Sequence, residues 1–201
     1  MKPRQIEQFL AIFARELGLP ARAYVTGACA AAFWGRVRPS LDIDFGLELP
    51  KGAAADWGRV EAAVERTSRL TGIPANVAAD IDRWGMITLL NYRRTSRSYK
   101  RFGRLDVRLL HPLNWSVGKL TRFLDPDVAD VREVFKRQRV DANAAARFWG
   151  RALRASPPSS AQFQFRRNVE RFFEIEGRAV WGRSWASEQA IAQFRRAARI
   201  R

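Results

Sequence analysis

The chain has 201 residues, 47% of them hydrophobic, which is enough for one domain or a domain and a half around a substantial core. Its 36 Lys and Arg exceed its 20 Asp and Glu by 16, so the chain favours a polyanionic partner, most economically nucleic acid, unless the arginines only solvate the surface. One cysteine and no apolar run near the roughly 20 residues that span a membrane predict a cytoplasmic protein without a disulfide, a cysteine zinc site or a membrane partner.

The first predicted elements are a helix, a strand and a phosphate-binding turn. Apolar residues recur at helical spacing over residues 2–17, and residues 23–26 are predicted as a short strand. The small residues Gly27 and Ala28 then predict a tight turn into a short helix. Because free backbone N–H groups at a helix start bind phosphate, we expect Thr26, Gly27 and Ala28 to contact a nucleotide.

Residues 41–45 predict a strand that carries two carboxylates on one face. Side chains alternate along a strand, so the apolar residues of this segment would point into a core while Asp42 and Asp44 share the opposite face. Two neighbouring carboxylates repel each other unless a cation lies between them. We therefore expect Asp42 and Asp44 to bind Mg2+ or Mn2+, cations that suit oxygen ligands.

These two motifs resemble the signature of a known superfamily. Gly27-Ala28, followed after thirteen residues by Asp42-Ile43-Asp44, is similar to the Gly–Gly/Ser…Asp-x-Asp signature of the nucleotidyltransferase superfamily, which has a Pol-β-like minimal nucleotidyltransferase fold. The resemblance implies an α+β fold in which a nucleotidyltransferase-like mixed β-sheet is flanked by helices. Since it covers roughly residues 20–135, we predict a nucleotidyltransferase-like domain at 1–135 and a helical, basic C-terminal region at 136–201.

The residues just before the two acids point to one branch of this superfamily. The run Arg38-x-Ser40-x-Asp42 resembles the branch of AbiEii-like bacterial toxins, which implies that Arg38 and Ser40 lie at the nucleotide. Arg38 could clamp a triphosphate or only balance the charge of the acids. Ala28 departs from the family, because many active members have a serine there whose hydroxyl touches the phosphate. Thr26 or the backbone alone would have to substitute.

The middle of the chain predicts a helix up to residue 70, strands at 75–81 and 86–90, and a basic segment at 91–104. This segment carries six cations and no acid, and aromatic residues lie among the cations. Such a mixture suits phosphate contact and base stacking in RNA, although a solvated hairpin tip would look similar. The residues expected to bind RNA here are Arg93, Arg94, Arg97, Lys100 and Arg101.

Residues 105–109 predict another alternating strand, with Asp106 on the face opposite its apolar residues. In the nucleotidyltransferase superfamily a third acid comes from a separate strand. The resemblance therefore implies that Asp106 completes the metal site of the first two carboxylates and acts as general base on the attacking hydroxyl. A salt bridge to Arg104 or Arg108 is the alternative. The enzyme interpretation depends on this convergence of three carboxylates.

Two helices are predicted between residues 115 and 137, and they resemble the Lys…Asp-x-x-Asp segment of the AbiEii-like branch. The resemblance implies that Lys119 neutralises charge on the triphosphate and that Asp130 holds Lys119 or Arg122 in position. Asp127 belongs to the same motif, but an acid after a proline in a first helical turn is also typical of helix capping.

From residue 141 onward the sequence predicts basic helices with a break at 156–159. Residues 136–201 hold 15 Lys and Arg against 5 Asp and Glu, a net +10 of the total +16. An apolar stripe that begins at Phe163 is expected to face a core, and Arg166 and Arg167 on the other side are expected to bind RNA. A solvated helical cap is the alternative.

Together these features predict a metal-dependent nucleotidyltransferase that transfers a nucleotide from an NTP to an RNA end, such as a tRNA acceptor stem. In the AbiEii-like branch such enzymes are toxins of toxin–antitoxin systems, so the resemblance also implies an antitoxin protein as a partner. Two alternatives remain open. One is a weak or inactive nucleotidyltransferase fold that acts as an RNA-binding or antitoxin-like module, and the other is nucleotide transfer to a protein hydroxyl.

Overall fold

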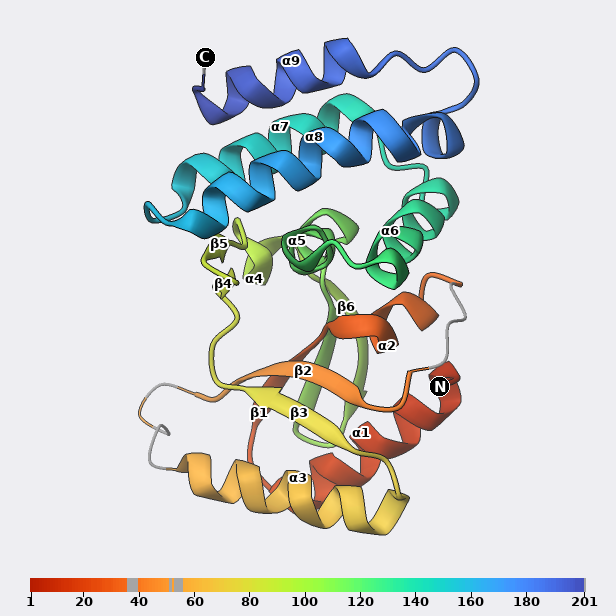
Figure 1. The fold of residues 1–201 in the computed structure, drawn as a ribbon. Helices are drawn as coiled ribbons and strands as arrows, with labels where there is room; N and C mark the ends of the chain where they lie inside the picture. Colours follow the sequence, from red (N-terminus) through yellow and green to blue (C-terminus); the bar gives the residue numbers. More distant parts are fainter. Residues whose placement is uncertain (36–39, 51, 53–55, 201) are drawn as a thin grey trace. The chain divides into compact units, whose positions relative to one another are not determined.

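The computed structural model describes residues 1–35, 40–50, 52 and 56–200, which form two compact units (Figure 1). The first unit comprises residues 1–81 and 93–110, and the second comprises residues 82–92 and 111–201. Each unit has its own sheet or helical core, and each is considered on its own. In the described part of the chain, every helix is too short or too polar to cross a bilayer.

A five-stranded mixed sheet is the centre of the first unit. The strands follow the order β3-β2-β1-β7-β6. β1 pairs antiparallel with β2 and parallel with β7, β2 and β3 are parallel, and β6 and β7 form an antiparallel hairpin. Their bounds are β1 (Ala21–Val25), β2 (Ile43–Glu48), β3 (Ala75–Ala78), β6 (Arg97–Phe102) and β7 (Leu105–Leu109). The predicted α+β class, with a mixed sheet flanked by helices, is confirmed.

Helices α1 (Pro3–Leu17) and α3 (Trp57–Thr71) lie side by side and cover the apolar face of this sheet (Figure 1). Phe13 of α1 meets Phe45 of β2 edge to face at 5.3 Å between ring centroids, and both side chains are fully buried. Edge-to-face pairs of this kind contribute about 0.5–1.5 kcal/mol beyond the burial of their area. The alternating apolar residues of β1, β2 and β7 therefore build one core with the two helices.

The opposite face of the sheet carries polar and charged side chains, and we call it the polar face. Its residues follow from the strand register, because aligned residues on neighbouring strands point to the same side. Arg22 is aligned with Glu48 on one side and Asp106 on the other, and Asp44 is aligned with Asn76. The polar face comprises Arg22, Tyr24, Asp44, Gly46, Glu48, Asn76, Arg101, Asp106 and Arg108.

Two predictions about strands were wrong in detail. β2 begins at Ile43, and Leu41 before it is 85% exposed, so the apolar alternation starts two residues later than expected. The basic segment 91–104, for which no helix or strand was predicted, forms the short helix α4 (Tyr92–Thr95) and the edge strand β6. Pairing with β7 supplies backbone hydrogen bonds that the local sequence, rich in arginine, does not reveal.

The second unit is helical around an aromatic core. Trp149 of α7 stacks on Phe135 of α6 at 5.5 Å and meets Phe172 of α8 edge to face at 5.9 Å. α7 and α9 touch so closely that a Cβ on Gly150 would lie 2.5 Å from the carbonyl oxygen of Phe194. The elements of the second unit are β4 (Arg83–Trp84), β5 (Ile87–Thr88), α5 (Pro112–Arg122), α6 (Asp125–Arg137), α7 (Ala142–Ala155), α8 (Ser160–Trp181) and α9 (Ser187–Ala198). The short helix α2 (Gly27–Ala32) belongs to the first unit.

The two units do not divide at residue 135. Helices α5 and α6 group with the C-terminal helices because they share packing with them. The Asn168 side-chain amide of α8 donates to the carbonyl of Leu120 in α5 at 2.7 Å. Within the apolar stripe of α8, Phe163 is 63% exposed, so the stripe buries its residues only from Phe165 onward.

Candidate functional site

Asp42 and Asp44 lie next to each other at the beginning of β2, and Asn76 of β3 connects them. The Asn76 amide nitrogen donates to Asp42 Oδ2 at 3.1 Å and to Asp44 Oδ1 at 2.9 Å. One amide group can bridge two carboxylates only when they stand side by side. The parallel pairing of β2 with β3 aligns Asp44 with Asn76, so the sheet itself fixes this arrangement.

The turn at Gly27 lies directly against the Asp44 carboxylate. Gly27 has a φ of +63°, and a Cβ added to it would fall 2.0 Å from Asp44 Oδ2. The backbone N–H of Thr26 donates to the Asp44 carbonyl at 2.9 Å, which fixes the turn to β2. Glycine is therefore required at this position both by the backbone conformation and by the close approach of the carboxylate.

The other residues predicted at the nucleotide have different surroundings. The Ser40 hydroxyl donates to the Asp42 carbonyl at 3.0 Å and lies 3.4 Å from Asp42 Oδ1, so Ser40 supports the conformation of Asp42. Ala28 is half-buried in the first turn of α2, a helix of six residues. Arg38 lies outside the described residues.

Cys29 lies behind the turn as a protonated thiol. Its Sγ donates to the carbonyl of Thr26 at 3.1 Å and lies 3.7 Å from the carbonyl of Asp44. Burial raises the pKa of Cys29 to about 12, and the negative charges of Asp44 and Asp42 act in the same direction. A thiol with this pKa is not a nucleophile at neutral pH.

Asp106 does not join the acidic pair, contrary to the prediction that it completes a metal site. Its Oδ2 accepts hydrogen bonds from Arg22 Nε at 3.2 Å and Arg108 Nε at 3.1 Å. Burial alone would raise the pKa of Asp106, but the hydrogen bonds from Arg108 and Arg22 outweigh it and lower the pKa. The alternative of an ion pair with Arg108 is the one that the structure shows.

The strand register gives the physical reason for this correction. The carbonyl of Asp44 accepts a hydrogen bond from the backbone N–H of Thr26, which follows β1. Asp106, in contrast, is aligned with Arg22 near the beginning of β1. Four residues of strand, roughly 13 Å, separate these two levels of the sheet. Asp106 therefore shares the polar face with Asp44 but stands at the other end of it.

The donors beside the turn fit a divalent cation less completely than predicted. Among the described residues, no group of three or more His, Cys, Asp or Glu side chains lies close enough together to hold a metal ion. Asp42 and Asp44 supply two carboxylates, and rotation of the Asn76 amide would turn its carbonyl oxygen toward them. Two carboxylates and an amide oxygen are ligands that suit Mg2+ or Mn2+.

Lys119 and Asp130, predicted by resemblance, meet in the second unit. The Lys119 ammonium donates to Asp130 Oδ2 at 3.0 Å and to Asp127 Oδ1 at 2.9 Å, and all three side chains are at most 3% exposed. Arg122 adds two further hydrogen bonds to Asp127, at 2.8 and 3.0 Å. Asp127 thus belongs to the buried cluster and does more than cap a helix.

The charge state of Asp127 follows from these partners. Burial alone would raise the pKa of Asp127, but the hydrogen bonds from Arg122 and then Lys119 outweigh it and lower the pKa. The cluster therefore contains ionised groups of both signs. Desolvation makes such groups costly to bury unless each remains paired, so the cluster holds α5 and α6 in a single arrangement.

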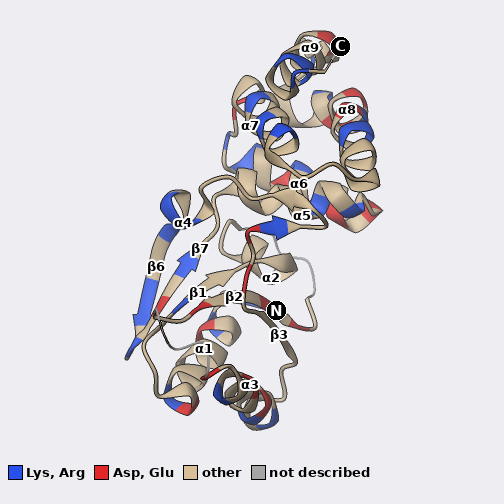
Figure 2. Ribbon diagram, turned by 90° about the vertical axis from the view of Figure 1, so that its left-hand side faces the viewer, with Lys and Arg blue, Asp and Glu red and all other residues tan. Residues whose placement is uncertain are grey.

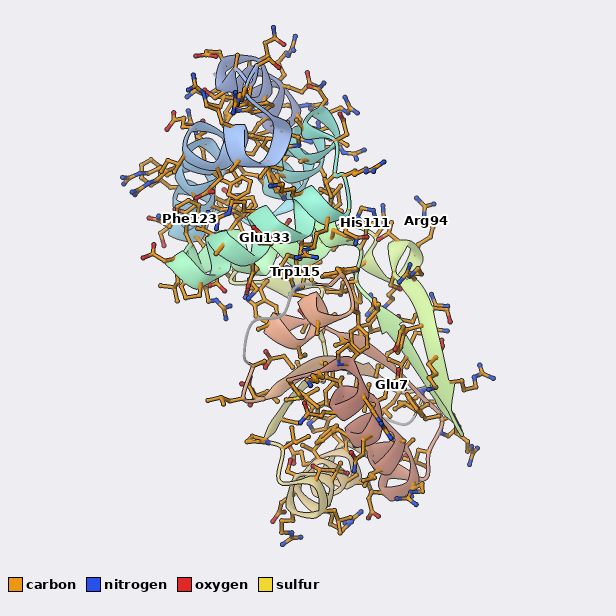
Figure 3. All side chains as sticks on the ribbon, turned by 90° about the vertical axis from the view of Figure 1, so that its right-hand side faces the viewer. Glu7, Arg94, His111, Trp115, Phe123 and Glu133 are labelled. Atoms are coloured by element: carbon orange, nitrogen blue, oxygen red, sulfur yellow. The ribbon has the colours of Figure 1, made fainter. Side chains whose placement is uncertain are left out.

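The basic residues predicted to bind RNA lie on three elements, α4, β6 and α8. Arg94, Arg97 and Arg101 of α4 and β6 are exposed, and Figure 2 shows the basic residues of these two elements in blue. Arg94 extends away from α4 (Figure 3). Arg93 pairs with Glu48 at 3.2 Å and Lys100 pairs with Glu7 at 2.8 Å. The latter two cations are therefore partly neutralised.

On α8 the two predicted RNA-binding residues are also engaged. Arg166 Nε lies 3.2 Å from Glu170 Oε1, and Arg195 of α9 shares the same carboxylate at 2.8 Å. Arg167 lies over the ring of the exposed Phe163, 5.9 Å from its centroid. An exposed aromatic ring beside a guanidinium suits a nucleic-acid surface, but the neutralised Arg166 makes α8 a weaker anion-binding element than β6.

Two residues of the polar face were not predicted, namely Asn76 and Arg22. Asn76 is the only link between the two carboxylates in the described structure, and its signal was a polar residue inside a predicted strand. Arg22 could not be recognised from its own sequence neighbours, because its partners Glu48 and Asp106 are far away in sequence.

Comparison of the chain with protein-family models, with curated proteins and with solved structures finds no match, so the assignment of the site depends on its geometry.

Proposed function

We propose that the protein is a metal-dependent nucleotidyltransferase that transfers a nucleotide from an NTP to an RNA end. The three carboxylates on which the sequence prediction depended do not converge, so the proposal stands on one observation: Asp42 and Asp44 stand side by side against the glycine turn at Gly27. The mixed sheet with helices on its apolar face agrees with the nucleotidyltransferase-like fold that the motifs resemble. The RNA could be a tRNA acceptor stem.

The chain's own residues would divide the work at this site. Asp42 and Asp44, with the amide oxygen of Asn76, would hold Mg2+ or Mn2+, which supplies charge neutralisation on the phosphates of the NTP. Gly27 would let the backbone of the turn approach those phosphates closely, because it has no side chain. Ser40 would keep the Asp42 carboxylate in position.

Lys119 and Asp130 are given no catalytic role, because both side chains are buried and paired with each other in the second unit. One further role rests on the resemblance alone. Membership of the AbiEii-like branch would make the protein the toxin of a toxin–antitoxin system, with an antitoxin protein as partner. Asp106 has no part in the proposed reaction, because it is paired with Arg22 and Arg108 at the other end of the sheet.

Transfer can be tested with magnesium, labelled NTPs and total RNA. We expect the protein to label RNA and Asp44→Ala to abolish the label, because one of the two carboxylates is lost. Glu61→Ala is the matched control, since it removes an exposed acid from α3 on the apolar side of the sheet. Label on protein in place of RNA would mean transfer to a protein hydroxyl, and equal labelling by Asp44→Ala would contradict the proposal.

A second candidate function is an RNA-binding or antitoxin-like module without turnover. Two observations favour it: Asp106 is committed to two arginines, and Ala28 provides no hydroxyl at the turn. This candidate predicts that the wild type and Asp44→Ala bind RNA equally well and that neither labels it. The same assay, followed by a binding measurement, therefore decides between the two functions.

A further inference from the structure

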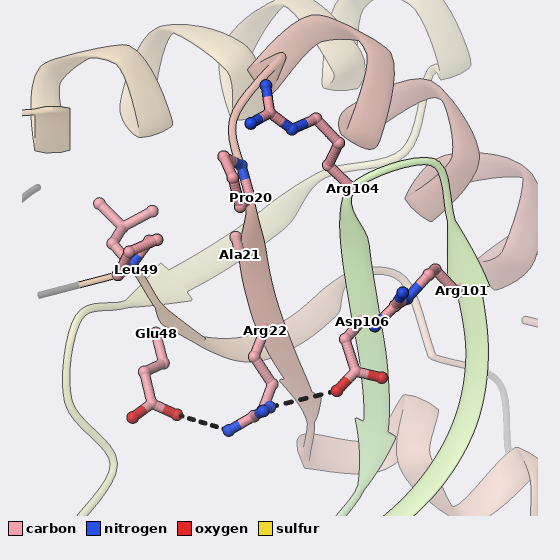
Figure 4. A pocket seen from close by; sticks show the side chains of 9 residues that line it. Pro20, Ala21, Arg22, Glu48, Leu49, Arg101, Arg104 and Asp106 are labelled. Carbon is pink, nitrogen blue, oxygen red and sulfur yellow. Dashed lines mark hydrogen bonds and ion pairs between the residues drawn. The ribbon is translucent and has the colours of Figure 1, made fainter.

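A cavity opens on the polar face of the first unit, at the end of the sheet far from Asp44. Its volume is about 360 Å3, and it is bounded by β1, the end of β2 and the β6–β7 hairpin (Figure 4). Three arginines and two acids line it, together with apolar residues near 20–21 and 49–50. The charged residues are Arg22, Glu48, Arg101, Arg104 and Asp106.

Arg22 stands between the two acids and is held by both (Figure 4). Its Nε donates to Asp106 at 3.2 Å, and its Nη1 lies 3.6 Å from Glu48. Each acid has another cation as well, because Asp106 also pairs with Arg108 at 3.1 Å and Glu48 with Arg93 at 3.2 Å. Three arginines thus share two carboxylates, so this row of charges is cationic before any ligand arrives.

Arg101 and Arg104 add uncompensated charge to the same cavity. Within the described part of the chain, neither forms an ion pair with a carboxylate, and the only hydrogen bond of the Arg104 side chain there goes to the carbonyl of Gly18 at 3.4 Å. Counting Arg93 and Arg108 at its margin, five arginines face two acids, a local net charge of +3. Such a cavity attracts an anion.

We propose that this cavity binds a backbone phosphate of the RNA acceptor. Guanidinium groups bind phosphate through two parallel hydrogen bonds, and the volume lies at the small end of ligand pockets, enough for a phosphate with its sugar. Arg108 is the next arginine on the polar face, since it is aligned with Tyr24 one step beyond the Arg22–Asp106 pair, whereas Arg97 is aligned with Leu109 and points to the other face. A polyanion could therefore leave the cavity past Arg108. A free nucleotide would bring the same phosphate chemistry and is the other source to test.

This inference rests on the proposed function, in which RNA is the acceptor, but it concerns a different part of the sheet. The cavity is level with Arg22, and the acidic pair is level with Thr26, roughly 13 Å further along β1. RNA bound in the cavity would therefore be held several nucleotides away from its reacting end. Loss of binding there and loss of transfer at Asp44 are separate measurements.

The test compares two double variants of the full-length protein that lose the same charge. Arg101→Gln with Arg104→Gln removes the two unpaired cations of the cavity. Arg59→Gln with Arg69→Gln removes two exposed arginines of α3, on the other side of the sheet. Binding of a fluorescein-labelled single-stranded RNA oligonucleotide is followed by anisotropy over a range of salt concentrations, without NTP or metal.

We expect the cavity variant to bind the RNA roughly tenfold more weakly at low salt. The slope of log affinity against log salt should fall by about 0.7, which corresponds to the one phosphate that the protein no longer neutralises. The α3 variant should change neither quantity to this extent. Equal losses in the two variants would show that only the overall charge matters, and that result would overturn the proposal.

Two further arms distinguish the sources of phosphate and check the sign of the charge effect. If AMP binds the wild type but not the cavity variant, while the cavity variant keeps the RNA affinity of the wild type, the cavity is a nucleotide site and the proposal is wrong.

Asp106→Asn removes a negative charge and frees Arg22 from one partner, so we expect tighter RNA binding. Weaker RNA binding by a folded Asp106→Asn protein, checked by circular dichroism, would contradict the proposal.

Discussion

Gly27 combines a left-handed backbone with direct contact to a carboxylate, and comparing its replacement with that of Gly72 separates these two effects. Gly27→Ala would place a methyl group 2.0 Å from Asp44 Oδ2, so the Asp44 side chain must leave its present position beside the turn. We expect this variant to lose transfer activity and Mn2+ binding, measured by titration calorimetry. It should also lose about 1–3 kcal/mol of stability in urea unfolding, because the new side chain adopts a strained φ.

Gly72→Ala is the control for this substitution. Gly72 ends α3 with a φ of +67°, and nothing lies within 4 Å of the position of its Cβ. The control therefore has the backbone strain without the displaced carboxylate, and it should keep Mn2+ binding. Equal metal binding by the two alanine variants would show that the turn does not position Asp44.

Cys29 gives a pH-dependent prediction at the same turn. The pKa of its thiol rises from 9.0 to about 12 on folding, so between these values the folded protein binds a proton that the unfolded protein has released. Stability must then fall as pH rises through this range, by up to about 1.4 kcal/mol per pH unit. Cys29→Ala should lack this part of the slope in urea unfolding measured at several pH values above 9.

Reaction with a thiol reagent provides an independent check. Because the thiol is buried and protonated, alkylation at neutral pH should be slow in buffer and fast in urea. Fast alkylation of the folded protein would show that the turn opens readily. A Cys29→Ala protein with an unchanged slope of stability against pH would mean that other groups, such as Tyr99, dominate in this range.

At the level of single residues, the sequence predicts what is local and misses what is paired across strands. Asp42 and Asp44 follow from alternation within one strand, and Gly27 follows from the small-residue turn. Asn76 and the real partners of Asp106 depend on strand register, which is set by contacts far apart in the sequence. A carboxylate can therefore be placed on the correct face and still stand at the wrong end of the sheet.

Among the elements, the α5–α6 pair depends on the buried cluster of Lys119. Lys119→Met keeps the length of the side chain but leaves Asp127 and Asp130 without its ammonium in a buried environment. Removing one partner of a buried ion pair costs about 3–5 kcal/mol, so we expect a loss of this size in urea unfolding. Five of the seven tryptophans lie in the second unit, which makes tryptophan fluorescence a suitable probe.

Lys136→Met in α6 is the matched control, because Lys136 is exposed and near the end of the same helix. It should change stability by less than about 0.5 kcal/mol. If Lys119→Met changed stability as little as this control, Asp127 and Asp130 would have become protonated or found other partners. The cluster would then hold its helices together much less than its burial indicates.

The elements themselves were predictable where their own sequence carries a strong period. α1, α3 and α5–α8 follow from apolar spacing, and β7 follows from strict alternation. β6 was not predictable in this way, since only Tyr99 and Phe102 of its six residues are even half-buried. Its strand conformation comes from hydrogen bonding to β7, a property of the hairpin as a whole.

For the whole molecule, the distribution of charge predicts which surface holds RNA. The first unit carries 17 basic and 10 acidic residues, and the second carries 19 and 10, so neither unit is neutral. Arg94→Gln with Arg97→Gln removes two exposed cations without acidic partners in the described structure. Arg166→Gln with Arg167→Gln removes the same charge from α8, where Glu170 already pairs with Arg166.

We expect the α4–β6 variant to weaken RNA binding more than the α8 variant, because a partly neutralised cation releases fewer counterions. The measurement is again the salt dependence of anisotropy with a labelled RNA. The slope should fall by about 1.4 for the α4–β6 variant and by less for the α8 variant. The reverse order would make α8 the main RNA-binding element.

The division into units was the feature of the whole molecule that the sequence did not predict. Composition changes near residue 135, where the basic C-terminal helices begin, but α5 and α6 pack with those helices. The reason is the aromatic core around Trp149, to which Phe135 of α6 contributes. Charge is a property of the surface, whereas the boundary of a compact unit is decided by its core.

The position of β6 at the edge of the sheet has a consequence for the behaviour of the protein in solution. An edge strand offers unpaired backbone groups to other chains, and positive charge together with a β-bulge, found here between Ser98 and Lys100, discourages such pairing. Electrolyte that screens these cations should therefore promote aggregation through β6. We expect concentrated samples to remain monodisperse at low ionic strength and to form oligomers as ionic strength rises.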